Sequence, residues 1–301
     1  MSEYRERGDR EHEDRACEYR ERGALIGRGA AVWTRTAGTG PQRVLPDGCT
    51  DLIWTEAGPD GELLVAGPDT RSRLAPGPPG SRAVGLRFAP GQGPTVLGVP
   101  AHELRDQLVP LAALWPGAEV RRLAERIADA KRTADADRIA DAERIAEAQR
   151  AADAARIAEA QRAADAERTA DAQRTAARQA AQGRLLEDVA LGRLRRAEPP
   201  DPVLAGIVAG VSRGTGVAGI AAAVGLGERQ LHRRSLAAFG YGAKTLGRVL
   251  RLNRALDLAR TGVPFAEVAA IAGYADQAHL AREVRTLTGV PLGRLLQGSG
   301  G

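Results

Sequence analysis

The sequence predicts an α+β protein with a small β-rich N-terminal domain, a long helix rich in Ala, Arg and Asp, and an all-α C-terminal domain. Three observations support this prediction. Short apolar stretches alternate with Pro- and Gly-rich turns over residues 24–99, which is typical of antiparallel strands. Residues 125–178 form a six-residue repeat rich in alanine, a strong helix former, with no glycine or proline. Near the C-terminus, apolar residues recur at helical spacing around two tight turns.

The N-terminal stretch, residues 1–23, contains almost nothing that a core could bury. Its clearest pattern is the hexapeptide EYRERG, which occurs at residues 3–8 and again at residues 18–23. Charged sequence with few apolar residues cannot bury enough surface to offset the entropy lost when the chain is ordered. We therefore predict a disordered leader over residues 1–23.

A β-rich, sensor-like domain is predicted over residues 24–118. Its strands are expected at the apolar stretches AVWT, DLIWTEA, ELLVAG and AVGLRFA, which are separated by turns such as GPDG and APGPPG. The expected core aromatics are Trp33, Trp54 and Phe88. Residues 98–115 are expected to form a helix that closes this domain.

Residues 119–183 are predicted to form a helical spacer that contains the repeat. Six residues advance an α-helix by about 240°, so Ile127, Thr133 and Ile139 point to three different faces and form no apolar seam. A solvated single helix ending at Gly183 is therefore favoured, and a coiled coil joining two chains is the alternative. One straight helix over residues 119–182 would be about 96 Å long at about 1.5 Å per residue.

A helical connector is predicted over residues 184–212, and two helix-turn-helix units over residues 213–298. In both units a small residue, Ala221 or Ala269, precedes a glycine by four positions. The small residue lets two helices approach closely, and the glycine permits the backbone conformation of a tight turn. The expected N-caps of the second helices are Gly227 and Asp276. The helix that joins the units carries Leu246, Val249, Leu252, Leu256 and Ala259 on one face and stops at Gly262.

This region resembles the DNA-binding domain of the AraC/XylS family of transcription regulators. The resemblance is carried by RQLHRR and AFGYGAKTL in the first unit, RLNRALDLA in the joining helix, and VAAIAGYADQAHLAREV and LTGVPLGRLL in the second unit. Leu280 and Val284 stand where the family usually has aromatic residues. LPDGCTDLIW, VAGPDT and GLRFAPG resemble a poorly characterised sensor-like domain that often precedes this DNA-binding domain, and this second resemblance implies no known ligand.

In a helix-turn-helix, the N-terminal part of the second helix enters the major groove of DNA. The resemblance implies base contacts from Arg229, His232 and Arg233 in the first unit, and from Ala278, His279 and Arg282 in the second. Gln277 shares the exposed face of the second helix and is a further candidate. The candidates for phosphate contacts, which position a protein without reading sequence, are Arg234, Lys244, Arg248 and Arg251.

The basic residues are concentrated in the C-terminal part of the chain. From residue 183 onward, 16 Lys and Arg stand against 9 Asp and Glu, a net charge of +7, whereas the whole chain carries +5. This excess favours double-stranded DNA as the partner. A cytoplasmic regulator of this kind is also expected to contact RNA polymerase, to respond to an effector that the sequence does not identify, and to be a candidate homodimer. No apolar run is long enough to span a membrane.

The sequence leaves two alternatives to a sequence-specific regulator. The N-terminal domain could be an enzyme or a small-molecule-binding domain with DNA binding secondary. However, residues 1–183 contain only two histidines, His12 and His102, and no catalytic motif surrounds either of them. We therefore expect no enzymatic activity and no cofactor. The other alternative is an architectural DNA binder without sequence preference.

Cys49 is interpreted as a small buried residue rather than a reactive thiol, because the neighbouring Asp47 and Asp51 would raise its pKa.

Overall fold

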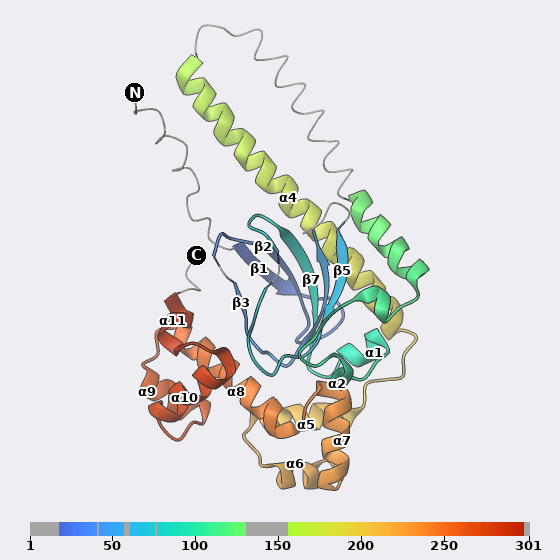
Figure 1. The fold of residues 1–301 in the computed structure, drawn as a ribbon, viewed down its shortest axis with the longest axis vertical. Coiled ribbons are helices and arrows are strands. Elements are labelled where there is room, and N and C mark those ends of the chain that lie inside the picture. The colour runs from blue at the N-terminus through green and yellow to red at the C-terminus, as the bar shows by residue number, and fades with distance from the viewer. Residues whose placement is uncertain (1–17, 41, 57–60, 76, 131–155, 298–301) are drawn as a thin grey trace, which may run out of the picture.

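The computed structural model describes residues 18–40, 42–56, 61–75, 77–130 and 156–297. Its N-terminal part is a six-stranded antiparallel sheet with the strand order β1-β2-β7-β4-β5-β8 (Figure 1). The strands are β1 (Glu18–Gly23), β2 (Ala31–Thr36), β4 (Thr50–Thr55), β5 (Glu62–Ala66), β7 (Arg82–Phe88) and β8 (Leu108–Pro110), and a separate pair is formed by β3 (Arg43–Val44) and β6 (Arg73–Leu74). The four predicted apolar stretches lie in β2, β4, β5 and β7, so the predicted α+β class and the β-rich domain are confirmed.

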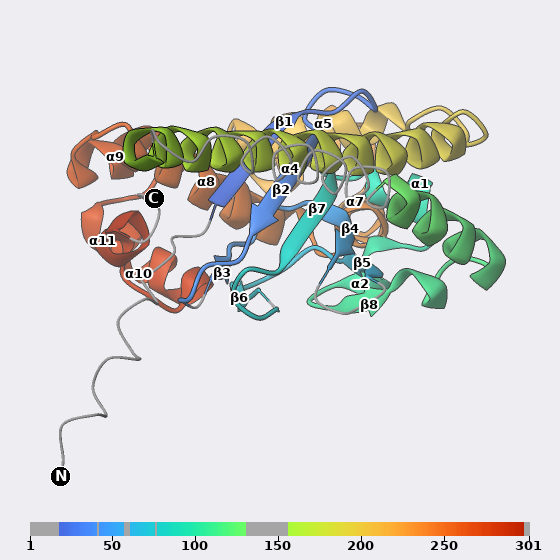
Figure 2. The ribbon, with the colours of Figure 1, turned by 90° about the horizontal axis from the view of Figure 1, so that it is seen from above.

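One face of the sheet is apolar and is covered by α4 (Arg156–Leu194) (Figures 1 and 2). The strand register places Val32, Leu86, Leu52 and Val65 in one row across β2, β7, β4 and β5. These residues share a core with Leu186 and Ala190 of α4. Trp54 and Phe88 belong to this core as expected. Trp33 is buried on the opposite face, where its ring lies over Gly85; a Cβ at Gly85 would lie 2.1 Å from the ring.

The predicted disordered leader extends too far into the chain. Residues 18–23 form β1, which pairs along its whole length with β2. The strand is exposed, so no apolar pattern marks it in the sequence; backbone hydrogen bonds and side-chain contacts order it instead. Residues 1–17 of the predicted leader lie outside the described residues.

The helix expected over residues 98–115 is wrong. The chain instead forms α1 (Gly93–Leu97), α2 (Ala101–Leu104), strand β8 and a short 3-10 helix, Leu111–Ala113. Asp106 has a φ of 59°, which breaks helical geometry, and Pro110 lacks the N–H that a helix would need. The apolar residues of this stretch fill gaps around the sheet, and pairing of β8 with β5 outweighs helix propensity.

The predicted straight spacer helix is also wrong. Residues 117–130 form one helix, and α4 runs past the expected stop at Gly183 to Leu194. Leu123 and Ile127 of the first helix enter the same core as Leu186 and Ala190 of α4, so the two ends of the spacer pack together on the sheet (Figure 1). Residues 131–155, most of the predicted spacer's first half, lie outside the described residues.

The remaining helices form the C-terminal region, at the bottom and left of Figure 1. They are α5 (Pro202–Ser212), α6 (Val217–Ala223), α7 (Glu228–Phe239), α8 (Ala243–Arg260), α9 (Phe265–Ala272), α10 (Gln277–Thr288) and α11 (Leu292–Gln297). The predicted connector over residues 184–212 is helical in two parts. Its first part completes α4, and its second part is α5, which is N-capped by Asp201 and places Ile207 and Val211 in the C-terminal core.

Candidate nucleic-acid interface

Helices α6 and α7 form the first helix-turn-helix unit. The turn between them contains Gly225 with a φ of +68°, a conformation that glycine adopts without strain. Ala221 is buried four residues earlier, together with Ile220 and with Leu231 of α7. Helix α7 begins after Gly227, whose N–H donates to the side chain of Gln230 at 3.3 Å. The predicted turn and N-cap are thus present.

Helices α9 and α10 repeat the arrangement. Gly273 has a φ of +83°, and Val268, Ala269 and Leu280 are buried around the turn. Asp276 caps α10, because its Oδ1 accepts the backbone N–H of His279 at 2.6 Å. A carboxylate cap of this kind fixes the first turn of the helix, which is the part that would face DNA.

Helix α8 connects two separate cores. Its first half contributes Leu246 and Val249 to the core of the first unit, and its second half contributes Leu252 and Leu256 to the core of the second unit. The predicted apolar face of α8, which also includes Ala259, is fully buried. Each unit therefore folds around its own core, and a single helix sets the separation between them.

The base-contact candidates of the first unit lie on the outside of α7. Arg229, His232 and Arg233 are all exposed, while Leu231 between them is buried. Neither arginine forms a hydrogen bond or ion pair with any residue that the structure describes. His232 packs against Gly242, where a Cβ would lie 2.8 Å from the His232 Nδ1 atom. The two guanidinium groups are thus available to an external partner.

The second unit has one candidate with an intramolecular role. Gln277, Ala278 and Arg282 are exposed, but His279 is half-buried. The Nδ1 atom of His279 accepts the Ala275 N–H at 3.2 Å, and its ring meets Tyr274 edge-on at a centroid distance of 5.3 Å. Because Nδ1 is an acceptor, a neutral His279 carries its proton on Nε2 and presents a hydrogen-bond donor.

Three of the four phosphate candidates are engaged within the protein. Arg234 pairs with Asp201 at 2.6 Å. Arg248 donates from Nε and Nη2 to the two carboxylate oxygens of Glu283 at 2.6 and 3.2 Å, which raises the pKa of Arg248 further and lowers the pKa of Glu283. Arg251 lies 4.8 Å from the ring centre of Tyr274 and donates to the Gly273 carbonyl at 3.4 Å. Lys244 is exposed.

The N-terminal domain contacts the C-terminal ends of both second helices. Arg105 Nη1 donates to the carbonyl of Gly240, directly after α7, at 3.3 Å. The Ser72 N–H donates to the Leu287 carbonyl at 2.8 Å, and Ser72 Oγ donates to the Thr288 carbonyl at 2.7 Å, at the end of α10. These carbonyls lack partners within their helices, so the N-terminal domain caps both helices. No sequence pattern indicates these contacts, because Arg105 and Ser72 lie far along the chain from their partners.

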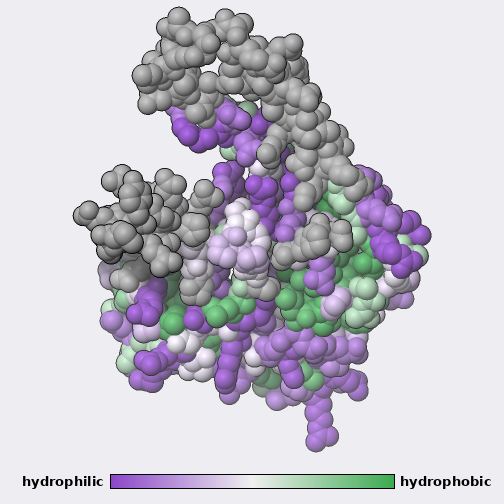
Figure 3. Space-filling view, turned by 45° about the horizontal axis from the view of Figure 1, so that its top comes forward, coloured by the Kyte–Doolittle hydropathy of each residue, from purple (hydrophilic) through white to green (hydrophobic). Residues whose placement is uncertain are grey.

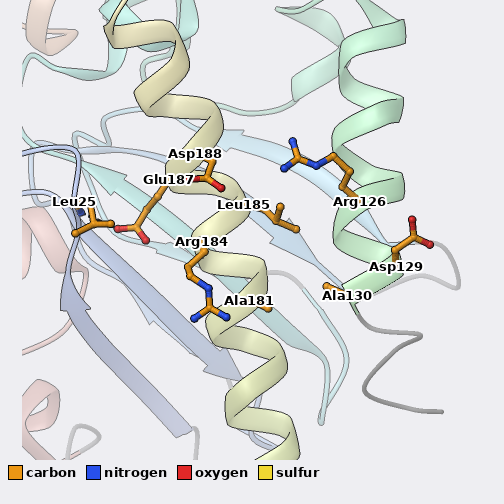
Figure 4. Close-up of a pocket in the computed structure, with 9 residues that line it drawn as sticks. All are labelled: Leu25, Arg126, Asp129, Ala130, Ala181, Arg184, Leu185, Glu187 and Asp188. Atoms are coloured by element: carbon orange, nitrogen blue, oxygen red, sulfur yellow. Dashed lines mark hydrogen bonds between the residues drawn. The ribbon is translucent and has the colours of Figure 1, made fainter. Parts of the chain in front are cut away.

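A groove that no sequence pattern indicates lies between α4 and the helix at residues 117–130 (Figure 4). Its volume is about 460 Å³. Arg126 and Arg184 extend into or along the groove from the two helices, and Leu25 borders it from the turn after β1. The other residues that line it are Asp129, Ala130, Ala181, Leu185, Glu187 and Asp188.

In the space-filling view, hydrophilic residues predominate over the lower part of the visible face, and hydrophobic residues gather nearer its middle (Figure 3). Among the described residues, no group of three or more His, Cys, Asp or Glu side chains is placed to hold a metal ion. Burial and the nearby Asp47 raise the pKa of the Cys49 thiol, as expected for an unreactive cysteine. None of the helices described is both long and apolar enough to cross a membrane.

Two family models match the chain. Residues 220–298 match a model described as a helix-turn-helix domain, and residues 30–110 match one described as a domain of unknown function (DUF6597). Comparison with curated proteins gives no match. Similar solved structures include ToxT from Vibrio cholerae O395, which is 9% identical with a TM-score of 0.44 over 91% of this chain and 100% of that one. ToxT bound to (E)-4-(8-methylnaphthalen-1-yl)but-3-enoic acid is 10% identical, with a TM-score of 0.42 over 94% and 99% of the two chains. The family matches therefore show an AraC-type helix-turn-helix DNA-binding domain over residues 220–298 and a domain of unknown function over residues 30–110.

Proposed function

We propose that the protein is a sequence-specific transcription regulator that reads two successive major-groove segments of DNA through α7 and α10. The proposal rests on the division of α7 and α10 into an exposed polar side and a buried apolar side, which both units share. The N-terminal turns of α7 and α10 carry exposed polar and basic side chains, while the apolar residues between them are buried in separate cores. A recognition helix needs this division, since one side must dock on the protein and the other must meet base edges.

Direct readout is assigned mainly to Arg233 and Arg282. An arginine in the major groove pairs bidentately with guanine O6 and N7, and such a contact is worth about 1–3 kcal/mol of discrimination against a wrong base. Arg229, His232 and Gln277 add hydrogen-bonding groups, and His279 offers its Nε2–H. Ala278 offers an apolar contact, for example to a thymine methyl group.

Lys244 is the foremost phosphate contact among the four candidates, because it is exposed at the start of α8. Arg234 is paired on the surface and exchanges its carboxylate partner for a phosphate at little cost. Arg248 is better assigned as a positioning residue, since its two hydrogen bonds to Glu283 join α8 to α10. Arg251, packed against Tyr274, supports the turn before α10.

The other partners follow from the same proposal. The N-terminal domain acts as a sensor for an effector, and the groove of Figure 4, with two arginines and three carboxylates in its lining, suits a polar small molecule better than an apolar one. RNA polymerase is the protein partner of a regulator of this class, and a homodimer would read two copies of the site.

Binding-site selection with the full chain, followed by substitution of each base pair, tests the proposal. Arg233→Ala and Arg282→Ala are expected to lower affinity for the selected site about 5- to 150-fold, the equivalent of about 1–3 kcal/mol, and to relax preference at one or two base pairs each. Lys244→Ala, the matched control, is expected to weaken selected and random DNA equally and to reduce the salt slope by about one. If selection yields no preferred sequence, or if both arginine variants act as uniformly as Lys244→Ala, sequence-specific readout by these helices is wrong.

A further inference from the structure

Strand β1 is an edge strand of the six-stranded sheet that the described residues form. It pairs with β2 on one side, and its residues are exposed along the whole strand. Three side-chain contacts hold it in place. Arg22 donates from Nη1 and Nη2 to the two carboxylate oxygens of Glu187 in α4, at 3.1 and 2.7 Å. Glu21 accepts from Arg87 of β7 at 3.1 Å, and Tyr19 stacks on Trp33 of β2 with the ring centres 6.1 Å apart.

The contact between Arg22 and Glu187 matters most, because the Glu187 carboxylate is buried. Its side chain is only 1% exposed, and it accepts the Leu25 N–H at 2.8 Å as well as the two bonds from Arg22. A buried carboxylate without a cationic partner is costly, so the position of Arg22 in the sheet has to be filled by a cation.

The sequence carries a second copy of this strand. Residues 3–8 are EYRERG, identical to residues 18–23. Tyr4, Glu6 and Arg7 therefore correspond to Tyr19, Glu21 and Arg22, and each of the three side-chain contacts of β1 has an equivalent donor, acceptor or ring in the first copy. The match covers the whole strand and includes the residues that reach Glu187, Arg87 and Trp33.

We infer that residues 3–8 of the same chain exchange with residues 18–23 at the β1 position, so that two identical strands compete for one edge of the sheet. With the second copy in place, the segment 24–30 connects the strand to β2; with the first copy in place, the connection is the roughly three-fold longer segment 9–30. Loop-closure entropy scales with the power 3/2 of loop length and favours the shorter connection about five-fold. The first copy is therefore the minor occupant.

The residues after each copy bias the exchange further. Ile26, which is 7% exposed in the core, would be replaced by Glu11, and this favours the second copy.

Disulfide trapping tests which copy visits Glu187. In a Cys17→Ser background, the full chain would carry Glu187→Cys together with Arg22→Cys, Arg7→Cys or, as the matched control, Arg15→Cys, which lies outside both hexapeptides. Under mild oxidation at low protein concentration, the Arg22→Cys pair is expected to form an intramolecular disulfide fastest, and the Arg7→Cys pair at a rate at least about five-fold lower. The Arg15→Cys pair should be slower still. An Arg7→Cys pair that reacts no faster than the Arg15→Cys pair, or that links only different chains, overturns the inference.

Stability measurements give an independent test. Arg22→Glu places a second carboxylate beside Glu187 and should lower the Tm, while Arg7→Glu alone should leave it unchanged. If the first copy can replace the second, the variant with both substitutions should lose more stability than the two single variants together, because neither copy can then supply the cation. A double variant that is no less stable than Arg22→Glu alone contradicts the exchange.

Discussion

At the scale of single residues, the pair of Arg248 and Glu283 shows how charge fixes the geometry of the DNA-binding domain. Its two hydrogen bonds connect α8, which spans both units, to the middle of α10. The Arg248 and Glu283 side chains are 34% and 14% exposed, so solvent screens the pair only in part. A bidentate guanidinium–carboxylate pair has a defined orientation, and this one holds α10 against rotation relative to α8.

This pair predicts a specific pH dependence of stability. Arg248 lowers the pKa of Glu283 in the folded protein. A carboxylate with a lowered pKa contributes stability above its unfolded pKa of about 4.3, and this contribution is lost as the pH falls through the folded value. We therefore expect Glu283→Gln to lower the free energy of unfolding by about 1 kcal/mol at neutral pH, and the difference from the wild type to vanish in acid.

Urea unfolding of the full chain and of Glu283→Gln, between about pH 3 and pH 7, measures this difference. Asp257→Asn is a suitable control, because Asp257 pairs with Arg260 within α8 and is 74% exposed. A difference for Glu283→Gln that stays constant over the whole range would show that the charge of Glu283 is not what stabilises α10.

At the scale of elements, α4 depends on a glycine for its contact with the sheet. A Cβ at Gly183 would lie 2.7 Å from Val32 Cγ1, so only glycine lets the helix approach β2 this closely. Gly192 lies in the same helix with no atom within 4 Å of its added Cβ. The two glycines therefore separate the effect of close packing from the effect of helix propensity.

We expect Gly183→Ala to destabilise the protein by about 1–3 kcal/mol, because overpacking forces the helix away from the sheet. Gly192→Ala should instead stabilise it by up to about 1 kcal/mol, since alanine is the better helix former. Thermal unfolding of both variants distinguishes these outcomes. Equal effects of the two substitutions would mean that α4 can move off the sheet without cost.

The C-terminal helices and α4 show which elements can be predicted from the sequence and which cannot. The helical units at the C-terminus follow from local signals: Gly225 and Gly273 adopt the expected positive φ, and Asp276 is the expected cap. The path of α4 depends instead on long-range packing against Val32, and glycine near a helix end is locally indistinguishable from a stop signal. The partners of Arg248 and Arg234 were missed for the same reason, since ion pairs between distant helices leave no local pattern.

At the scale of the whole molecule, the C-terminal region contains what it needs to fold alone. Its two cores are built from residues of α5 to α11, with Leu45 of the N-terminal domain packed against one of them. The matched helix-turn-helix family begins at residue 220 and so leaves out α5, although Ile207 of α5 is fully buried in the core of the first unit. Helix α5 is therefore part of the folding unit.

We expect a fragment of residues 198–301 to fold and to bind duplex DNA with an affinity that falls steeply as salt rises. A fragment of residues 220–301, the matched control, should be largely unfolded because it exposes the surface that Ile207 and Val211 cover. Circular dichroism and DNA-binding titrations at two salt concentrations measure both properties. A longer fragment that is folded but binds no DNA at about 50 mM salt would contradict the assignment of this region as the DNA-binding part.

The hydrogen bonds given by Arg105 and Ser72 of the N-terminal domain reach α7 and α10 beyond the turns that carry the candidate base contacts. Arg105 and Ser72 hold the carbonyls at the far ends of these helices, after Phe239 and at Thr288. In each helix, the N-terminal turns are therefore open to DNA, and the C-terminal end is attached to the neighbouring domain. Under the proposed function, base recognition and domain attachment can for this reason diverge separately, and replacing only the first two turns of either helix would change the DNA sequence that is read while leaving the contacts of Arg105 and Ser72 in place.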